Sequence, residues 1–234
     1  MAIYITGDTH GITDIQKVIT WYEVNKDKLN ENDILIICGD VNIPPFYGVP
    51  EDKRALPIFE KMKIQIAYVD GNHENFEKLN AMEIEEWNGG KIHRQSKNVV
   101  HLMRGQIYTI EDKKILTIGG ATSLDRYRRI LGLDYFKEED IMQCDIDETL
   151  NNLKKNNYEV DIIVTHTIGR EFIYKKMYND VHAYDSYMGG INTFLDYVDD
   201  LTRYKDWYFG HFHIDVDYIG TKKHAIYNRI LKIN

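Results

Sequence analysis

The sequence predicts an α/β fold, because short apolar strands alternate with amphipathic helices along much of the chain. Residues 33–38 and 64–69 are almost continuously apolar, as expected for strands of a sheet that is buried on both faces. Several strands end in glycine followed by a polar side chain: Gly7-Asp8, Gly39-Asp40 and Gly71-Asn72. Because parallel strands share one carboxyl edge, we expect these polar side chains to converge there.

The first half of the chain predicts strands at residues 2–6, 33–38 and 64–69. A helix is expected from Thr13, because apolar residues recur at the spacing of one helical face from Ile15 onward. Another is expected over residues 52–63, where Pro57 disturbs regularity, and a short one over residues 76–87.

From residue 91 to residue 120 the apolar period becomes two, which predicts antiparallel strands of a second sheet or its start. Residues 125–139 are polar, arginine-rich and aromatic, and predict a surface loop with some helix. A helix is then expected over residues 139–156, with these side chains facing inward: Met142, Ile146, Leu150 and Leu153.

The last third predicts a strand at residues 160–164, an amphipathic helix at 191–201 and a strand at 207–209. Further strands are expected between residues 214 and 231. Residues 168–190 are rich in tyrosine without clear periodicity, a length of loop that often serves function. Four of its tyrosines would line a substrate pocket, form a homo-oligomer interface or simply pack: Tyr174, Tyr178, Tyr184 and Tyr187.

Composition bounds the function of the 234-residue chain, which we expect to form one domain over residues 1–234. The net charge of −8 disfavours nucleic acid as the main partner. No apolar stretch approaches the roughly 20 residues that span a bilayer, so no membrane partner is expected. Cys38 and Cys144 lack metal-site spacing, and the N-terminus enters a strand directly, so we expect a cytoplasmic protein.

Five motifs place polar side chains at the ends of expected strands: Asp8-x-His10, Gly39-Asp40, Gly71-Asn72-His73-Glu74, Thr165-His166 and Gly210-His211-x-His213. Taken singly, each has an ordinary explanation, because aspartate, asparagine and glycine are common in helix caps and turns. Turn chemistry does not predict five ordered motifs rich in histidine. Together they indicate a metal centre.

Seven side chains are candidate metal ligands: Asp8, His10, Asp40, Asn72, His166, His211 and His213. One ion takes about four to six donors, so seven fit two divalent ions that share a carboxylate. Imidazole, carboxylate and amide oxygen together suit Mn, Fe, Zn, Co or Ni, with Mn favoured. Ions about 3.5–4 Å apart hold a bridging water as nucleophile for phosphoryl displacement. His73, surplus to the ligand count, is the expected general acid or a phosphoryl-binding group.

The ordered motifs resemble the calcineurin-like metallophosphoesterase family over residues 3 to about 213. The family pattern is Asp-x-His, Gly-Asp, Gly-Asn-His-(Asp/Glu), a lone His and Gly-His-x-His. The resemblance implies a four-layer α/β/β/α sandwich with two mixed β-sheets face to face. It also implies that one ion is held by Asp8, His10, Asp40 and His213, and the other by Asp40, Asn72, His166 and His211. His73 and Asp40 would then be catalytic, with Glu74 as the supporting partner of His73.

One feature departs from the protein phosphatase branch of that family, and a second points to another subgroup. That branch has Asp-Arg-Gly after its second aspartate, whereas this chain continues Asp40-Val41-Asn42, so the phosphate-binding arginine is missing there. The stretch from Gly119 to Arg128 is similar to a bacterial and phage-type metallophosphatase subgroup. Arginines in that region are candidates to replace the missing charge, chiefly Arg126 and Arg128, together with Arg129 and more weakly Arg170. A solvated charge run is the ordinary alternative.

The resulting hypothesis is a dimetal-dependent phosphoester hydrolase, either a phosphatase or a phosphodiesterase. One alternative is a metal-dependent nuclease acting on short oligonucleotides, which the net charge of −8 and the lack of a basic stripe disfavour. Another is a catalytically silent scaffold with the same fold, although no ligand is lost here. Specificity would come from loops at residues 41–56, 122–138 and 168–190. The remaining histidines are taken as structural or surface residues: His93, His101, His182 and His224.

Overall fold

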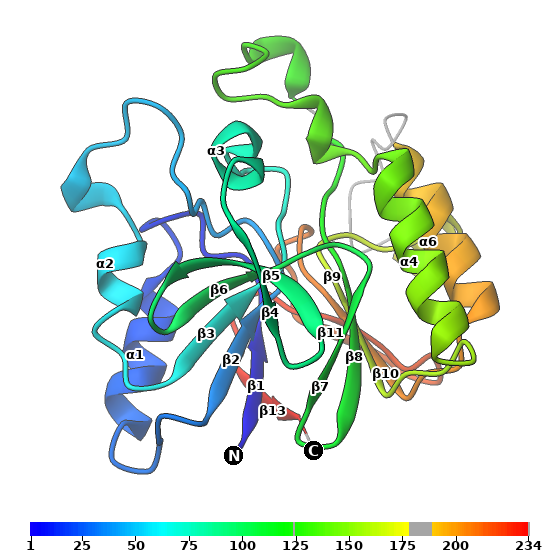
Figure 1. Ribbon diagram of the computed structural model, residues 1–234, viewed down its shortest axis with the longest axis horizontal. Helices are drawn as coiled ribbons and strands as arrows, with labels where there is room; N and C mark the ends of the chain where they lie inside the picture. Colours follow the sequence, from blue (N-terminus) through cyan, green and yellow to red (C-terminus); the bar gives the residue numbers. More distant parts are fainter. Residues whose placement is uncertain (124, 178–188, 234) are drawn as a thin grey trace.

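The computed structural model describes residues 1–123, 125–177 and 189–233, and Figure 1 shows their course. Two mixed β-sheets lie face to face, and helices cover the outer face of each sheet. This arrangement confirms the predicted α/β class and its four-layer sandwich.

The first sheet has the strand order β13-β1-β2-β3-β6-β5-β4 in the described part of the chain. Its strands are β1 (Ile3–Thr6), β2 (Ile34–Ile37), β3 (Gln65–Tyr68), β4 (Ile84–Trp87), β5 (Gly90–Ser96), β6 (Val99–Leu102) and β13 (Leu231–Ile233). The pairs β1–β2, β2–β3 and β3–β6 are parallel. The carboxyl ends of β1, β2 and β3 therefore share one edge.

The second sheet has the order β11-β12-β10-β9-β8-β7. Its strands are β7 (Gln106–Ile110), β8 (Lys113–Ile118), β9 (Ile162–Thr165), β10 (Asp206–Phe209), β11 (Val216–Tyr218) and β12 (Lys223–Ala225). The central pairs β8–β9, β9–β10 and β10–β12 are parallel. The ends of β9 and β10 thus form a second row of loops that can meet those of the first sheet.

Three apolar layers hold the sandwich together. The layer between the sheets contains Ile36 and Val100 from the first sheet and Ile115 and Val164 from the second. The outer layers are closed by α1 (Gln16–Asn25) and α2 (Leu56–Phe59) on the first sheet and by α4 (Gln143–Lys155) and α6 (Gly190–Leu201) on the second. Burial on both faces explains why the central strands are continuously apolar.

Short helices occupy the loops that rise above the strand ends in Figure 1 or join the larger elements. They are η1 (Glu51–Lys53), α3 (Phe76–Asn80), η2 (Arg126–Arg128), η3 (Lys137–Glu139), α5 (Arg170–Phe172) and the π-helix η4 (Ile173–Met177). The loop with some helix expected at residues 125–139 is confirmed by η2 and η3. Part of residues 168–190 is helical, whereas residues 178–188 lie outside the described part.

The helix expected over residues 76–87 is wrong in its second half. The helix α3 ends at Asn80, and Ile84–Trp87 forms β4, which pairs with β5. Trp87 faces Gly90 across a two-residue turn, in which Asn88 and Gly89 have φ of 49° and 85°. Asn-Gly is the strongest short hairpin signal, and here it outweighed the helical interpretation.

Other boundaries also differ from the sequence expectations. The helix expected from Thr13 begins at Gln16, and residues 52–63 contain only the end of η1 and the short α2, which has Pro57 in its first turn. Met142 precedes α4 and is 43% exposed, so its inward placement was wrong. The strands of residues 91–120 divide between the sheets. β6 pairs with β3 in the first sheet, whereas β8 pairs with β9 in the second sheet and β7 pairs with β8.

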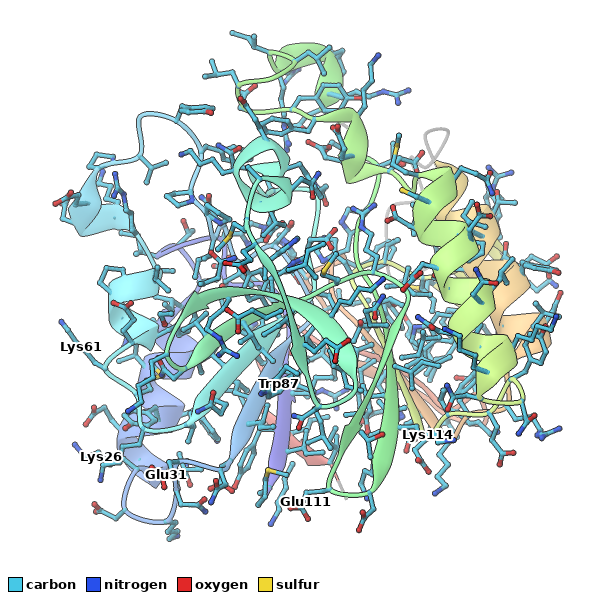
Figure 2. All side chains as sticks on the ribbon, viewed as in Figure 1. Lys26, Glu31, Lys61, Trp87, Glu111 and Lys114 are labelled. Atoms are coloured by element: carbon cyan, nitrogen blue, oxygen red, sulfur yellow. The ribbon has the colours of Figure 1, made fainter. Side chains whose placement is uncertain are left out.

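The edge opposite the strand-end loops is covered by charged side chains. Lys26, Glu31 and Glu111 project from loops and turns there, as Figure 2 shows. Among the described residues, no helix combines the length and the apolar character needed to cross a bilayer.

Candidate metal centre

The predicted side chains meet where β1, β2 and β3 of the first sheet and β9 and β10 of the second sheet end. We call this cluster the strand-end site; it consists of Asp8, His10, Asp40, Asn72, His73, His166, His211 and His213. Its members come from five separate loops, as the sequence predicted from the shared edge of parallel strands.

Asp40 lies at the centre of the strand-end site. Its Oδ2 is 3.2 Å from Nε2 of His10 and 3.4 Å from Nε2 of His166. Its Oδ1 accepts a hydrogen bond from the backbone N–H of His73 at 2.8 Å. One buried carboxylate therefore faces imidazoles from both sheets and also fixes the turn that carries His73.

Asp8 forms the second acidic point of the site. Its Oδ2 lies 3.2 Å from Nε2 of His213, and its Oδ1 accepts the backbone N–H of His211 at 3.1 Å. Asp8 is fully buried, whereas the side chain of His213 is 47% exposed. The site therefore opens to solvent beside His213.

Asn72 presents its amide oxygen to the site. Oδ1 lies 3.1 Å from Nε2 of His166, while Nδ2 donates to Oγ of Ser123 at 3.0 Å. Because the Ser123 hydroxyl donates its proton to the carboxylate of Glu139, it accepts from Nδ2 of Asn72, and this leaves Oδ1 pointing inward. The His211 ring lies 5.0 Å from the His166 ring, and burial, followed by the charge of His166, lowers the pKa of His211 to about 3.

The glycines of the motifs are required because carboxylate side chains lie against their backbone. A Cβ on Gly71 would lie 2.1 Å from Oδ1 of Asp40, and one on Gly210 would lie 2.2 Å from Oδ1 of Asp8. Either contact would displace the carboxylate that the turn surrounds.

The backbone is left-handed at several residues that carry the functional side chains. The φ angles are positive at His10 (43°), Asp40 (52°), His211 (67°) and His213 (53°). This conformation costs about 1 kcal/mol or more for a residue with a Cβ, although His and Asp tolerate it better than most. Strain of this kind typically accumulates at functional sites.

The electrostatics of the site are dominated by its carboxylates. Burial alone would raise the pKa of Asp40, but the neighbouring imidazoles of His166 and His73 hold it well below its ordinary value. Burial likewise opposes protonation of His166 and His10, yet Asp40 raises their pKa values to about 10 and about 9, with help from Asp8. The site therefore attracts positive charge.

The donor set fits divalent metal ions. Three groups have ligand atoms within 4.8 Å of one another: Asp8, His10 and His213; His10, Asp40 and His73; and Asp8, Asp40 and His166. The groups share members, so they form one continuous cluster of carboxylate and imidazole donors. Such a mixture suits Mn, Fe, Zn, Co or Ni. His211 lies outside these groups, next to His166.

An arginine from the loop at residues 125–139 reaches His73. Nη2 of Arg129 lies 3.0 Å from Nε2 of His73, and the guanidinium also pairs with Asp125 at 2.9 Å and with Glu139 at 3.6 Å. A guanidinium only donates hydrogen bonds, so the contacted nitrogen of His73 accepts. Burial lowers the pKa of His73, in agreement with a neutral ring.

Arg126 and Arg128, the substrate arginines expected from the sequence, lie in the same run as Arg129. Both side chains are exposed in η2, and the guanidinium carbon of Arg128 lies 5.2 Å from the centre of the Tyr127 ring. Arg129 is the member of the run that turns inward. The run itself was visible in the sequence, but nothing in it showed which arginine would face His73.

Glu74 differs from its expected role as the partner of His73. Its carboxylate accepts backbone N–H groups of Val41 at 2.7 Å, Asn42 at 3.2 Å and Gly71 at 2.8 Å. Burial, followed by the charges of Asp40 and Asp70, raises the pKa of Glu74 to about 8. Glu74 therefore ties the turn after β2 to the turn after β3, and it supports Asp40 and Asn72 rather than the His73 ring.

Several other candidates supply no donor side chain to the site, although the carbonyl oxygen of Cys38 lies 2.7 Å from Nδ1 of His166. Cys38 is a buried core residue, as expected. His224 contacts Asp217 and Asp206, and Tyr174 is 52% exposed. The expectations for four residues fall outside the described part of the chain: Tyr178, His182, Tyr184 and Tyr187.

The fold and this donor cluster together have the arrangement expected for the phosphoesterase class. A family model described as calcineurin-like phosphoesterase matches residues 1–215. The chain therefore belongs to the calcineurin-like phosphoesterase family.

Comparison with solved structures gives distant similarities. A putative 5'-nucleotidase from Staphylococcus aureus shares 15% identity at a TM-score of 0.48, covering 97% of this chain and 48% of that one. The phosphopantetheinyl hydrolase of Mycobacterium tuberculosis shares 13% identity at a TM-score of 0.48, covering 97% and 88%. The chain thus spans about half the length of the nucleotidase structure. No curated protein sequence matches the chain.

Proposed function

We propose that the strand-end site holds two divalent ions, with manganese favoured, and hydrolyses a phosphoester. The convergence of carboxylates and imidazoles from five loops carries this proposal. One ion would be held by Asp8, His10, Asp40 and His213, and the other by Asp40, Asn72, His166 and His211. When bound, two such ions supply an activated water and polarise the phosphoryl oxygens.

Arg129 is the residue that we assign to the phosphoryl group. Its guanidinium is close to His73 and is held from behind by Glu139, so it is oriented before substrate arrives. Arginine matches the geometry of phosphoryl oxygens and replaces the charge missing after Asp40. When the guanidinium binds the phosphoryl group, it leaves Nε2 of His73 free.

His73 is the proposed general acid for the leaving oxygen. Its ring lies 5.5 Å from the His10 ring, and its backbone is fixed by Asp40, so the imidazole is positioned at the site. The charge of Asp40 favours a proton on this ring, whereas burial and Arg129 oppose it. Transfer of Arg129 to the substrate removes one of the opposing charges from His73. We therefore expect protonation of His73 to accompany substrate binding.

The test compares p-nitrophenyl phosphate with bis-p-nitrophenyl phosphate, using metal-stripped protein to which Mn²⁺ is returned. Turnover of the monoester would define a phosphatase, and preference for the diester would define a phosphodiesterase. His73→Asn should lower kcat by about 10²–10⁴-fold while bound manganese stays unchanged. His224→Asn, which changes a histidine that contacts Asp217 and Asp206 and is no member of the strand-end site, is the matched control.

Two results would overturn the proposal. If the metal-stripped protein binds no manganese, the strand-end site is not a metal centre. If His73→Asn retains full activity, His73 is not the general acid, even where the metal assignment survives.

A further inference from the structure

Glu139 is a buried carboxylate at the end of the loop that carries Arg129. Its side chain lies among different partners on its two oxygens, and the residue is only 1% exposed. Oε2 accepts a hydrogen bond from the hydroxyl of Ser123, whereas Oε1 faces Nη1 of Arg129 at 3.6 Å and the backbone N–H of Phe136 at 3.3 Å. Glu139 belongs to none of the five sequence motifs, so its contacts alone indicate its role.

The Ser123 contact extends to a candidate metal ligand. Oγ of Ser123 accepts from Nδ2 of Asn72 at 3.0 Å, and Oδ1 of Asn72 faces Nε2 of His166 at 3.1 Å. Ser123 and Asn72 are both buried, so bulk water would not replace a lost hydrogen bond between them. The hydroxyl has one proton, which it donates to Glu139, and it therefore presents only lone pairs to Asn72. Glu139 thus determines which end of the Asn72 amide faces the strand-end site.

The other oxygen of Glu139 holds Arg129 against the body of the protein. Arg129 also pairs with Asp125 at 2.9 Å, but Asp125 belongs to the same loop and its side chain is 53% exposed, so this pair does not anchor the loop. The tip of the loop packs little, since Tyr127 and Ile130 are exposed. The inward direction of Arg129 therefore depends on its buried partner, Glu139.

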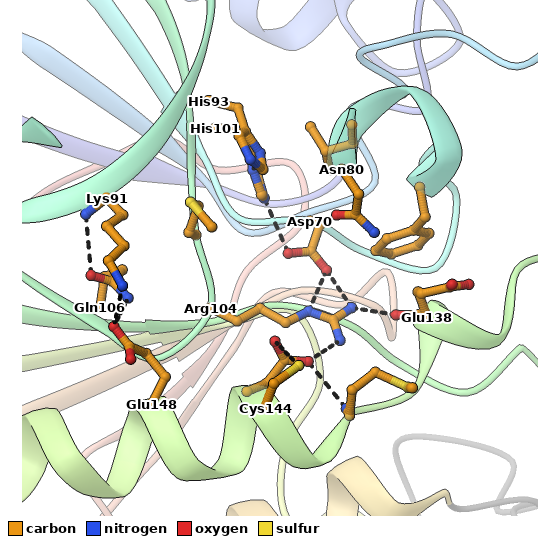
Figure 3. Close-up of a pocket in the computed structure, with 15 residues that line it drawn as sticks. Asp70, Asn80, Lys91, His93, His101, Arg104, Gln106, Glu138, Cys144 and Glu148 are labelled. Atoms are coloured by element: carbon orange, nitrogen blue, oxygen red, sulfur yellow. Dashed lines mark hydrogen bonds and ion pairs between the residues drawn. The ribbon is translucent and has the colours of Figure 1, made fainter. Parts of the chain in front are cut away.

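The backbone around Glu139 is fixed on both sides by one guanidinium. Arg104 donates to the carbonyl oxygen of Glu138 at 2.7 Å and to that of Asp140 at 2.9 Å, and Figure 3 shows the first of these contacts. Nε and Nη2 of Arg104 bind Oδ2 of Asp70 at 2.8 Å and 2.6 Å. An anchor held in this way orients its partners rather than following them.

Arg104 and Asp70 also line a cavity of about 470 Å³ between α3, β5 and α4 (Figure 3). Two histidines line it as well: Nδ1 of His93 lies 3.1 Å from Nδ1 of His101, and Nε2 of His101 lies 3.1 Å from Oδ1 of Asp70. The buried charges of Arg104 and Asp70 neutralise each other, so this pair is a complete support for the backbone at Glu139.

We propose that Glu139 is a positioning residue that orients both Asn72 and Arg129 from one buried carboxylate. This role rests on the proposed function, in which Asn72 binds an ion and Arg129 binds the phosphoryl group. Holding both from one anchor fixes the guanidinium relative to that ion, and a phosphoryl group must reach the two at the same time. Because each oxygen of Glu139 serves a different partner, substitution can separate the two effects.

Glu139→Gln keeps the shape of the side chain but replaces one acceptor oxygen with an N–H donor. Two donors face Oε1, so the new amide nitrogen is expected toward Ser123, whose hydroxyl then loses its acceptor. In metal-stripped protein, one of the two Mn²⁺ dissociation constants should rise about 10-fold. The dissociation constant of inorganic phosphate for the manganese-saturated protein should rise about fivefold, the net value of one hydrogen bond.

Calorimetric titration measures both constants without substrate turnover. Burial raises the pKa of Glu139 to about 7, so titrations at pH 8 keep its carboxylate ionised. Glu138→Gln, the same change at the adjacent half-buried glutamate, is the matched control and should leave both constants unchanged.

Two further variants separate the partners of Glu139. Ser123→Ala should weaken Mn²⁺ binding about 10-fold and leave phosphate binding at saturating Mn²⁺ unchanged. Arg129→Met should do the reverse, with a loss of phosphate affinity of about 10-fold or more. Ser123→Ala added to Glu139→Gln should cause no further loss of Mn²⁺ affinity, because both changes break the same connection. A residue that only stabilised the loop would not produce this separation.

Unchanged Mn²⁺ constants in Glu139→Gln, or in Ser123→Ala where Glu139→Gln folds poorly, would overturn the connection to Asn72. Unchanged phosphate affinity in Glu139→Gln would overturn the connection to Arg129. Unaltered protein that binds no Mn²⁺ would overturn the proposed function, and this role with it. Unaltered protein that binds two ions, beside a Glu139→Gln variant with the same constants, would overturn the role of Glu139 alone.

Discussion

Two histidine-rich clusters lie on opposite sides of the turn after β3, and their electrostatics are opposite. In the strand-end site, Asp40 and Asp8 have no cationic Lys or Arg side chain within ion-pair distance among the described residues. Their charge raises the pKa of His166 to about 10 despite burial. That cluster needs a cation to be complete.

In the cavity, the protein supplies the cation itself. Arg104 pairs with Asp70, and the pKa of His93 falls to about 4 through burial and the neighbouring His101. Histidine and aspartate are present in both clusters, so residue type alone does not identify a metal centre. The two clusters differ in whether an arginine of the protein neutralises the charge of the buried carboxylate.

The largest expected effect comes from removing the shared carboxylate of the strand-end site. Asp40→Asn should lower manganese-dependent phosphoesterase activity by about 10³-fold, because metal chemistry contributes several kcal/mol to the transition state. Asp27→Asn, a change of an exposed carboxylate, is the control. Activity assays and bound-metal analysis are the measurements, and full activity in Asp40→Asn would remove the distinction between the clusters.

Breaking the internal pair of the cavity should affect stability instead. Arg104→Met leaves Asp70 charged and buried, so the free energy of unfolding should fall by about 3 kcal/mol in urea denaturation. The double variant Asp70→Asn with Arg104→Met should recover part of this loss, because no unpaired charge remains. Simple additivity of the two single changes would show that the pair is not coupled.

Metal addition should stabilise one cluster only. At a Mn²⁺ concentration about 100 times its dissociation constant, the free energy of unfolding should rise by about 2.7 kcal/mol. His93→Phe should show the same gain, because the cavity provides no ligand, whereas Asp40→Asn should show little. Calorimetric or chemical unfolding of the metal-stripped protein, with and without Mn²⁺, measures it. An equal gain in Asp40→Asn would place the ion elsewhere.

At the mouth of the strand-end site, Arg129→Met should lower kcat/KM by about 10–100-fold, the value of a hydrogen bond to a charged group. Arg203→Met is the control, since the Arg203 side chain is 74% exposed and pairs only with Glu159 in the described structure. A larger loss of kcat/KM in Arg126→Met or Arg128→Met would favour these two residues, the ones predicted from the sequence, as the substrate arginines.

The last expected effect is a pH dependence that arises in the cavity. The folded pKa of His93, about 4, lies below its ordinary value of 6.5, so the unfolded chain binds more protons between these values. This contribution is fully present above pH 6.5 and is lost as the pH falls toward 4, by up to about 1 kcal/mol per pH unit. The difference between the unaltered protein and His93→Phe in urea unfolding at several pH values isolates it. A difference that does not vary with pH would contradict a neutral, buried His93.

The donor cluster was predictable because its signals are local. Each motif couples an apolar strand to a glycine turn, and parallel strands align their ends without further information. The Asn88-Gly89 signal for a hairpin was equally local. The sequence prediction nevertheless gave more weight to the helical pattern of the residues before it, and the structure shows that the hairpin signal was the correct one.

The cavity could not be predicted in the same way. His93 faces His101 only because β5 and β6 pair in one register, and Arg104 reaches Asp70 across 34 residues of sequence. The inward turn of Arg129 depends likewise on tertiary contacts with Glu139 and His73. Pairing across strands and loops carries no pattern within the sequence itself.

The left-handed backbone at the strand-end site has a consequence for selection in the laboratory. At His10, Asp40, His211 and His213 the conformation is one that glycine adopts freely. A library enriched only for heat resistance would therefore favour glycine at these positions, whereas one enriched for turnover would retain the side chains. The positions where the two libraries disagree would trace the outline of the active centre without any assay of its substrate.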